Sequence, residues 1–332
     1  MKTIKILFGI LIAISIYACS GDDNDEFKPI IAEDVAFFED GEVEMLFDNA
    51  GPDGITMVFI GDGYVKEDLG KSFGSYRKDA ERYFETLFNT EPFAGYQEHF
   101  NAMIIYAESQ SRTIPEGEEN ADSTALKTYT ITTSNNFSRF SSDPLRINFY
   151  KNKIPVNYRN NTNTLIVIND RSGGNACFRC DVGYSGSNSE GTMVHEVGHS
   201  FAGLGDEYEI NNNTNPTNTS IRENLDITDN LDNIKWKRFI GLPGYENVGA
   251  YEGGGLVSFG VWRPEINSIM RQSSTNLQFN APSREAIVKR IYEIREIPYD
   301  FETFLVNDVV TRQAIPIFNK TKNIHSLVGC SH

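Results

Sequence analysis

The chain has little cysteine and an excess of negative charge. It holds four cysteines in 332 residues, far below the density of proteins built on disulfides, so burial of apolar side chains must hold the fold together. Its 46 Asp and Glu outnumber 30 Lys and Arg, which gives a formal net charge of −16. Affinity for phosphate backbones comes mainly from clustered cations. We therefore expect no nucleic-acid partner.

The apolar run near the start of the chain is too short to cross a membrane. It covers residues 6–18, after Lys2 and Lys5, whereas a bilayer of about 30 Å needs about 20 residues at 1.5 Å each. Such a run is typical of a signal peptide. The residues around Cys19 (Tyr-Ala-Cys-Ser) resemble a bacterial lipobox, in which cleavage before the cysteine precedes acylation of its thiol. Residues 1–18 are therefore predicted to be a lipoprotein signal peptide.

An acidic stretch follows Cys19. Residues 20–25 read Ser-Gly-Asp-Asp-Asn-Asp and resemble the segment behind the lipidated cysteine of surface-exported bacterial lipoproteins. We interpret residues 19–35 as an acidic tether and residues 36–332 as one domain. The prediction is a monomer, anchored through Cys19 to the outer membrane and exposed at the cell surface, where two or more acyl chains would hold it durably.

Strand-like and helix-like segments alternate after the tether. The strand-like runs cover residues 54–65, 102–107 and 164–168, and the helix-like runs cover residues 66–88 and 282–294. This order favours an α/β fold with a mostly parallel sheet. We expect Asn280 or Ser283 to cap the last helix, and residues 211–220, rich in Asn and Thr, to form an exposed loop.

His195 and His199 are the most informative pair in the chain, which has only five histidines. Residues four apart share one face of a helix, so two imidazole nitrogens could meet one metal ion at about 2.0–2.1 Å. Glu196 lies beside them, where it could reach a water on that ion. This H-E-x-x-H arrangement is typical of zinc-dependent hydrolysis, in which the glutamate takes a proton from the water.

The third ligand must come from a chain reversal after His199. Gly203 and Gly205 follow one turn later and Asp206 comes directly after them. If the helix continued, Asp206 would lie about 10 Å up the axis and out of reach. We predict Asp206 as the third ligand, with Glu207 as the competing choice. A distant ligand, as in gluzincins, would be sought first at Glu223.

Four further features are candidates for the same site. Met270 lies in a sequence similar to the Met-turn of metzincins, although an ordinary core methionine would give the same pattern. Tyr208 could donate a hydrogen bond to the oxyanion of the reaction, or tie its loop to the core. Glu252 could orient a ligand histidine, or be a solvated loop carboxylate. Residues 183–186 are expected to form an edge strand that pairs with substrate.

Cys177 and Cys180 form a C-x-x-C motif. In an exported protein we expect a local disulfide that stiffens the edge-strand region. The alternative is a redox module, which predicts thiol-dependent activity insensitive to chelators. With Cys19 lipidated, the partner of Cys330 stays open.

Three segments together resemble the M64 peptidase family, the IgA peptidases: HEVGHSFAGLGDEY at residues 195–208, FDNAGPDGITMVFIGDGYVKEDL at residues 47–69, and GAYEGGGLVSFGVWRPEINSIM at residues 249–270. The resemblance implies zinc on His195, His199 and Asp206, Glu196 as general base, and Met270 as the Met-turn. Compared with the usual metzincin spacing, the glycine and third ligand come one residue late, at Gly203 and Asp206.

The resemblance implies a metzincin-like zincin catalytic domain, with a twisted, mostly parallel sheet and an active-site helix that carries the H-E-x-x-H motif. The implied function is a zinc-dependent endopeptidase that hydrolyses extracellular proteins or peptides at the bacterial surface. The alternative is a catalytically silent, zinc-containing surface lipoprotein that binds proteins or glycans.

Overall fold

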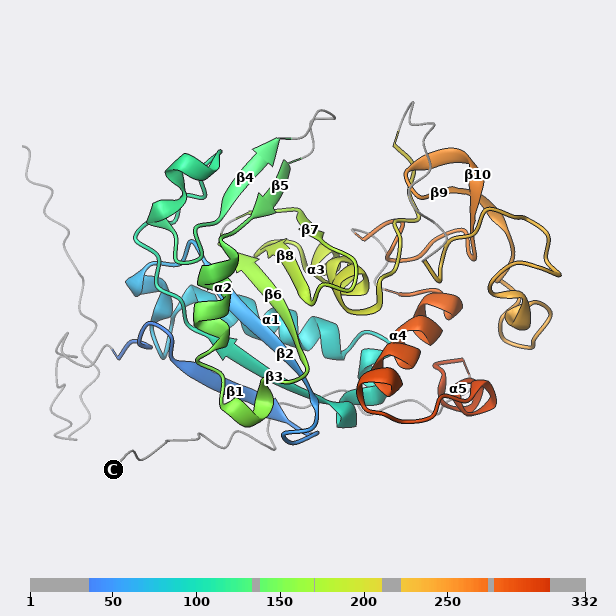
Figure 1. Ribbon diagram of the computed structural model, residues 1–332, viewed down its shortest axis with the longest axis horizontal. Coiled ribbons are helices and arrows are strands. Elements are labelled where there is room, and N and C mark those ends of the chain that lie inside the picture. The colour runs from blue at the N-terminus through green and yellow to red at the C-terminus, as the bar shows by residue number, and fades with distance from the viewer. Residues whose placement is uncertain (1–35, 133–137, 170, 211–221, 274–277, 311–332) are drawn as a thin grey trace, which may run out of the picture. The chain divides into compact units, whose positions relative to one another are not determined.

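The computed structural model of the chain describes residues 36–132, 138–169, 171–210, 222–273 and 278–310. Within them, six strands form one sheet in the order β1-β3-β2-β6-β8-β7 (Figure 1). In sequence order the strands are β1 (Val43–Asp48), β2 (Ile55–Asp62), β3 (Phe100–Ile105), β6 (Thr162–Ile168), β7 (Gly174–Ala176) and β8 (Val182–Gly186). The four inner strands run parallel, and β1 and β7 are antiparallel to their neighbours. The predicted α/β fold with a mostly parallel sheet is confirmed.

The sheet is covered by helices on both faces. Every residue of β2 is buried, as expected for a parallel strand packed on two sides. Met57 and Phe59 contact the core beneath α1 (Ser75–Phe88), whereas Val58 and Ile60 contact the core beneath α2 (Pro144–Lys151) (Figure 1). The alternation of side chains along the strand therefore divides the protein into two apolar layers.

The prediction of one continuous helix over residues 66–88 is wrong in its first part. A 3₁₀ turn covers Lys66–Leu69, and α1 begins only at Ser75. The carboxylate of Asp68 accepts hydrogen bonds from the N–H of Val65 at 3.1 Å and the hydroxyl of Ser75 at 3.1 Å. Gly74 has no room for a side chain, since a Cβ there would lie 2.5 Å from the carbonyl oxygen of Asp68. These contacts hold a turn where periodicity suggested a helix.

Three helices after β8 lie in the part of the chain that forms the site. They are α3 (Glu190–Val197), which continues into a π-helical turn (Gly198–Ala202), α4 (Ala281–Ile294) and α5 (Phe301–Asn307). Buried residues of α3 and α4 join the same apolar layer as α1. The amide oxygen of Asn280 accepts a hydrogen bond from the N–H of Ser283 at 3.0 Å, so Asn280 caps α4.

Two hairpins and four short 3₁₀ turns complete the described structure. The hairpins are β4 (Tyr129–Thr132) with β5 (Ser138–Ser141), and β9 (Tyr251–Gly254) with β10 (Val257–Arg263). The 3₁₀ turns cover Phe93–His99, Glu118–Ser123, Val156–Tyr158 and Lys237–Phe239.

Several predictions fall outside the described residues. These are the signal peptide and tether over residues 1–35, with Cys19, the loop over residues 211–220, and Cys330. In the described part of the chain, the helices are too short or too polar to span a bilayer.

Candidate metal centre

The chain reverses directly after the histidine pair. His195 lies in the last turn of α3, and His199 lies in the π-helical turn that follows. Gly203 ends this turn with φ of 71°, a left-handed conformation that favours glycine. The predicted helix break is therefore present, although His199 is displaced from a regular α-helix. π-Helical turns of this kind occur often at functional sites.

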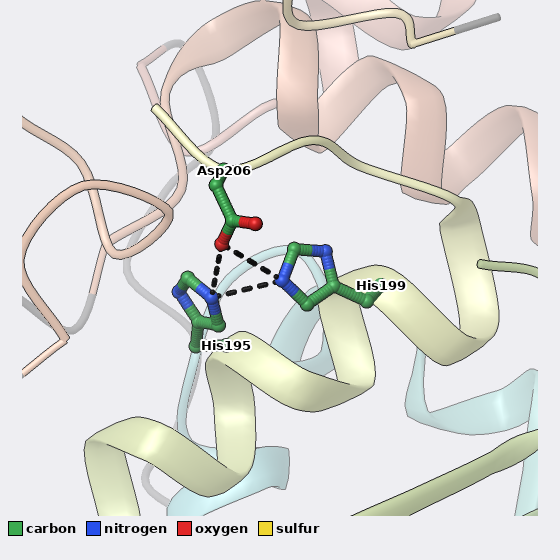
Figure 2. Close-up of side chains that lie close together, drawn as sticks. All are labelled: His195, His199 and Asp206. Carbon is green, nitrogen blue, oxygen red and sulfur yellow. Dashed lines mark hydrogen bonds and ion pairs between the residues drawn. The ribbon is translucent and has the colours of Figure 1, made fainter. Parts of the chain in front are cut away.

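His195, His199 and Asp206 converge on one point (Figure 2). The Nε2 atom of His195 lies 3.0 Å from Oδ1 of Asp206, and Nε2 of His199 lies 3.1 Å from the same oxygen. The two Nε2 atoms lie 2.9 Å apart. Both histidines are buried and Asp206 is largely so. The structure thus brings together the three residues predicted as ligands.

The outer ring nitrogens determine where the imidazole protons lie. Nδ1 of His195 faces the carbonyl oxygen of Ile269 at 3.0 Å, and Nδ1 of His199 faces the carbonyl oxygen of Leu204 at 2.6 Å. Carbonyl oxygens only accept, so each Nδ1 must donate its proton. In the neutral rings both Nε2 lone pairs then point at each other and at the carboxylate of Asp206. Such a group of acceptors is repulsive unless a cation lies among them.

The donor set fits a divalent metal ion. A tetrahedral ion with bonds of about 2.0–2.1 Å spaces its ligand atoms about 3.4 Å apart, close to the observed separations of 2.9 to 3.1 Å. Two imidazoles and one carboxylate leave a fourth position open, as in catalytic sites. Burial alone would raise the pKa of Asp206, but positive charge shared with His199 and His195, either protons on the imidazoles or a bound cation, lowers it and keeps the carboxylate ionised.

Glu196 lies beside this group without being part of it. Its side chain is buried, and its Oε2 atom has no hydrogen-bond partner among the described residues. Burial raises the pKa of Glu196 to about 7, although the nearby His195 opposes the shift. A buried carboxyl without a partner is costly. It is also well placed to exchange a proton near neutral pH.

Glu207 and Glu223 are not among the converging ligands. Glu207 is fully buried and turns away from the histidines, because its carboxylate accepts three hydrogen bonds. The donors are Ser268 Oγ at 2.6 Å, Asn280 Nδ2 at 2.7 Å and Asn224 Nδ2 at 2.8 Å. Glu223 is exposed. The alternative of Glu207 as third ligand is not supported by this geometry, and Glu207 instead joins the loop to the start of α4.

Met270 lies beneath the π-helical turn, in the position expected of a Met-turn. It is completely buried. A Cβ built on Gly198 would lie 2.8 Å from its sulfur, so the absence of a side chain at Gly198 lets the two segments approach. The N–H of Glu207 donates to the carbonyl oxygen of Met270 at 2.8 Å. The backbone of residues 269–270 therefore makes two contacts at the site: Ile269 hydrogen-bonds to His195, and Met270 hydrogen-bonds to the loop that carries Asp206.

Tyr208 lies at the site, whereas Glu252 does not serve the histidines. The Tyr208 ring centroid is 6.3 Å from that of His195. Burial, and then the negative charges of the nearby Asp206 and Glu196, raise the pKa of Tyr208 above its ordinary value. Glu252 is exposed and accepts from the N–H of Gly260 at 3.1 Å. Backbone carbonyls, not Glu252, face the outer histidine nitrogens.

The prediction that residues 183–186 form the edge strand is wrong by one strand. These residues lie in β8, which pairs with β6 on one side and β7 on the other. The edge of the sheet is β7, whose Gly174 approaches the site most closely. A Cβ on Gly174 would lie 2.9 Å from Cγ of Glu196. The Gly-Gly pair at residues 173–174 was the available sequence signal for this close approach.

Cys177 and Cys180 are joined by a disulfide just after β7. The loop that they close packs on the metal centre: the Phe178 ring meets His199 edge-on at 5.1 Å, and the N–H of Arg179 donates to the carbonyl oxygen of His199 at 3.1 Å. The disulfide thus stiffens the region next to the edge strand. Phe178 is a neighbour of the site that residue patterns did not reveal.

A family of known proteins matches a large part of the chain. Residues 46–244 match the family model described as IgA Peptidase M64. This range covers more than half of the chain and includes His195, Glu196, His199 and Asp206, whereas Met270 lies beyond it. No curated protein matches the chain.

The two neighbouring carboxylates should respond differently to substitution. Asp206→Ala should lower metal affinity by at least about 100-fold, because even partners of metal ligands are worth 10–100-fold. Glu207→Gln should keep its metal but lower the free energy of unfolding by about 1–3 kcal/mol, because it disturbs three buried hydrogen bonds. Elemental analysis after dialysis and thermal melts measure the two effects. Full metal content in Asp206→Ala would contradict the assignment.

Gly174 should be needed to position Glu196. In Gly174→Ala the new Cβ would lie 2.6 Å from the carbonyl oxygen of Tyr184 and 2.9 Å from Cγ of Glu196. We expect peptide cleavage to fall by about tenfold or more, because small displacements of reacting groups are costly, with metal content unchanged. Gly183→Ala is the matched control, since its nearest contact is 3.5 Å. Equal activities of the two variants would refute the close approach.

Proposed function

The chain belongs to the IgA peptidase M64 family and is a metallopeptidase, and we propose that it is a zinc-dependent endopeptidase acting on extracellular proteins or peptides. One observation carries the proposal. Three acceptor atoms of His195, His199 and Asp206 converge within 3.1 Å beside the buried Glu196, whose Oε2 has no partner among the described residues. This arrangement fits peptide hydrolysis better than a closed structural metal site.

The catalytic roles follow from the positions of the side chains. His195, His199 and Asp206 would hold the ion. Zinc bound there supplies a Lewis acid that polarises a carbonyl and makes water a stronger acid. Glu196 accepts the proton of the attacking water and passes it to the leaving amine, a role suited to a carboxyl whose pKa is raised to about 7.

The edge strand β7 offers a place for the substrate. It is the last strand of the sheet within the described residues, and an extended peptide can add to such an edge through backbone hydrogen bonds. Gly174 brings this strand against Glu196, so a peptide paired with β7 passes close to the general base. Backbone pairing explains binding without requiring one particular side chain.

Met270 and Tyr208 support a metzincin-like assignment. Met270 is buried beneath the turn that carries His199, as a Met-turn would be. The ring centroid of Tyr208 lies 6.3 Å from that of His195, and its hydroxyl could donate to the oxyanion that forms when water attacks the peptide carbonyl.

Glu196→Gln should keep the metal and lose peptide cleavage by at least about 100-fold, the usual contribution of a general base. A library of fluorogenic peptides, with and without chelator, measures the activity, and zinc should restore the chelated wild type. Glu190→Gln is the control on the same helix. Unchanged turnover in Glu196→Gln would contradict the role of Glu196 as general base. A metal-loaded wild type that cleaves no peptide would favour a catalytically silent binding protein.

The cellular location rests on the sequence alone. We propose that residues 1–18 are removed, that Cys19 is lipidated, and that residues 19–35 hold a single catalytic domain over residues 36–332 at the outer face of the outer membrane. An acidic tether repels itself and extends, which would keep the domain away from the membrane.

Cys19→Ser should move the protein from the membrane fraction to the soluble fraction, because the acyl chains supply the membrane affinity. Fractionation with immunoblotting measures this, with Ser20→Ala as the control. Retention of Cys19→Ser in the membrane fraction would exclude the lipid anchor.

A further inference from the structure

Two arginines border the candidate metal centre. Arg139 lies in β5 and Arg222 lies just before Asn224. Among the described residues, neither guanidinium has a hydrogen-bond or carboxylate partner, whereas Arg77, for example, pairs with Glu44 at 2.7 Å. Unpaired cations at a reaction centre stand out in a chain with a net charge of −16.

Arg139 is placed by contacts between β5 and the edge strand. The side chain of Asn175 in β7 binds the backbone of Phe140 twice: Oδ1 accepts from its N–H at 2.6 Å and Nδ2 donates to its carbonyl oxygen at 3.1 Å. Phe140 is buried, so the neighbouring Arg139 points to the opposite side of the strand, which is exposed. Asn175 adjoins Gly174, where a Cβ would lie 2.9 Å from Cγ of Glu196, so β5 borders the site.

Arg222 is placed by a stack on the disulfide loop. Its guanidinium lies 3.2 Å from the ring centroid of Phe178, which in turn meets His199 edge-on at 5.1 Å. The carbonyl oxygen of Arg222 accepts a hydrogen bond from Lys235 Nζ at 2.7 Å. The stack on Phe178 therefore holds the Arg222 guanidinium at the rim of the site.

The chemistry of these positions favours anionic ligands. A guanidinium presents a planar fork of donors that matches a carboxylate and is rarely deprotonated. Solvated surface arginines are common, but here the backbone of each arginine is held beside the site, that of Arg139 by pairing of β5 with β4 and that of Arg222 by Lys235. Because they come from separate elements, they would contact separate positions of a bound peptide.

We propose that Arg139 and Arg222 bind carboxylates of the substrate, so that the enzyme prefers peptides with Asp or Glu close to the scissile bond. The inference rests on the proposed endopeptidase function and adds a substrate class to it. Both arginines are specificity-determining residues, because they contact side chains of the substrate and not the bond that is cleaved.

The test compares peptides that differ only by Glu or Gln at single positions on either side of the cleaved bond. Wild-type kcat/KM should favour Glu by about threefold or more at two or more positions, the size expected for partly exposed ion pairs. Arg139→Gln and Arg222→Gln should each bring the ratio of kcat/KM for Glu over Gln peptides to about one at a different position. Lys78→Gln, which removes one exposed positive charge from α1, is the control and should keep every preference.

A binding measurement gives a second readout. The Glu196→Gln variant should bind fluorescent Glu peptides more tightly than Gln peptides, and this difference should shrink as salt is raised. Cleavage of the library with equal kcat/KM for Glu and Gln would overturn the inference and leave the endopeptidase function standing. A uniform loss for all peptides in Arg222→Gln would mean that Arg222 only supports Phe178, which also contradicts the proposal.

Discussion

The site depends on holding three electron-rich atoms together in a buried position. The imidazoles of His195 and His199 must keep their protons on Nδ1, because the carbonyl oxygens of Ile269 and Leu204 face those atoms. Their other nitrogens then meet the carboxylate of Asp206. This group is unfavourable without a cation, so the surrounding turns must hold it in place. The left-handed Gly203 and the buried segment of Met270 provide that support.

Three acidic residues lie side by side in this region, and their surroundings separate their roles. Asp206 lies against His195 and His199, and positive charge held among the three keeps its carboxylate ionised. Glu207, the next residue, receives three hydrogen bonds and links the loop to the start of α4. Glu196 is buried with one oxygen unpartnered among the described residues. The same functional group thus has three different surroundings: a candidate metal site at Asp206, a hydrogen-bonded junction at Glu207, and a buried position suited to proton transfer at Glu196.

The sequence predicts what depends on local spacing and misses what depends on distant contacts. His195, Glu196, His199 and the chain reversal at Gly203 could be inferred because one helix turn and one glycine decide them. The edge strand β7 could not, because its three residues, Gly174–Ala176, carry no periodicity. Nor could the carbonyls of Ile269 and Leu204, because every residue has such a group. The prediction of one helix over residues 66–88 was wrong because the Asp68 side chain accepts hydrogen bonds from Val65 and Ser75, which stabilise a turn there.

The most direct measurement is anomalous diffraction at the zinc absorption edge from crystals of the zinc-loaded protein. The account predicts one strong peak within about 2.0–2.2 Å of Nε2 of His195, Nε2 of His199 and a carboxylate oxygen of Asp206, with no fourth protein ligand. A peak bound by Glu207, or one enclosed by four protein ligands, would contradict it.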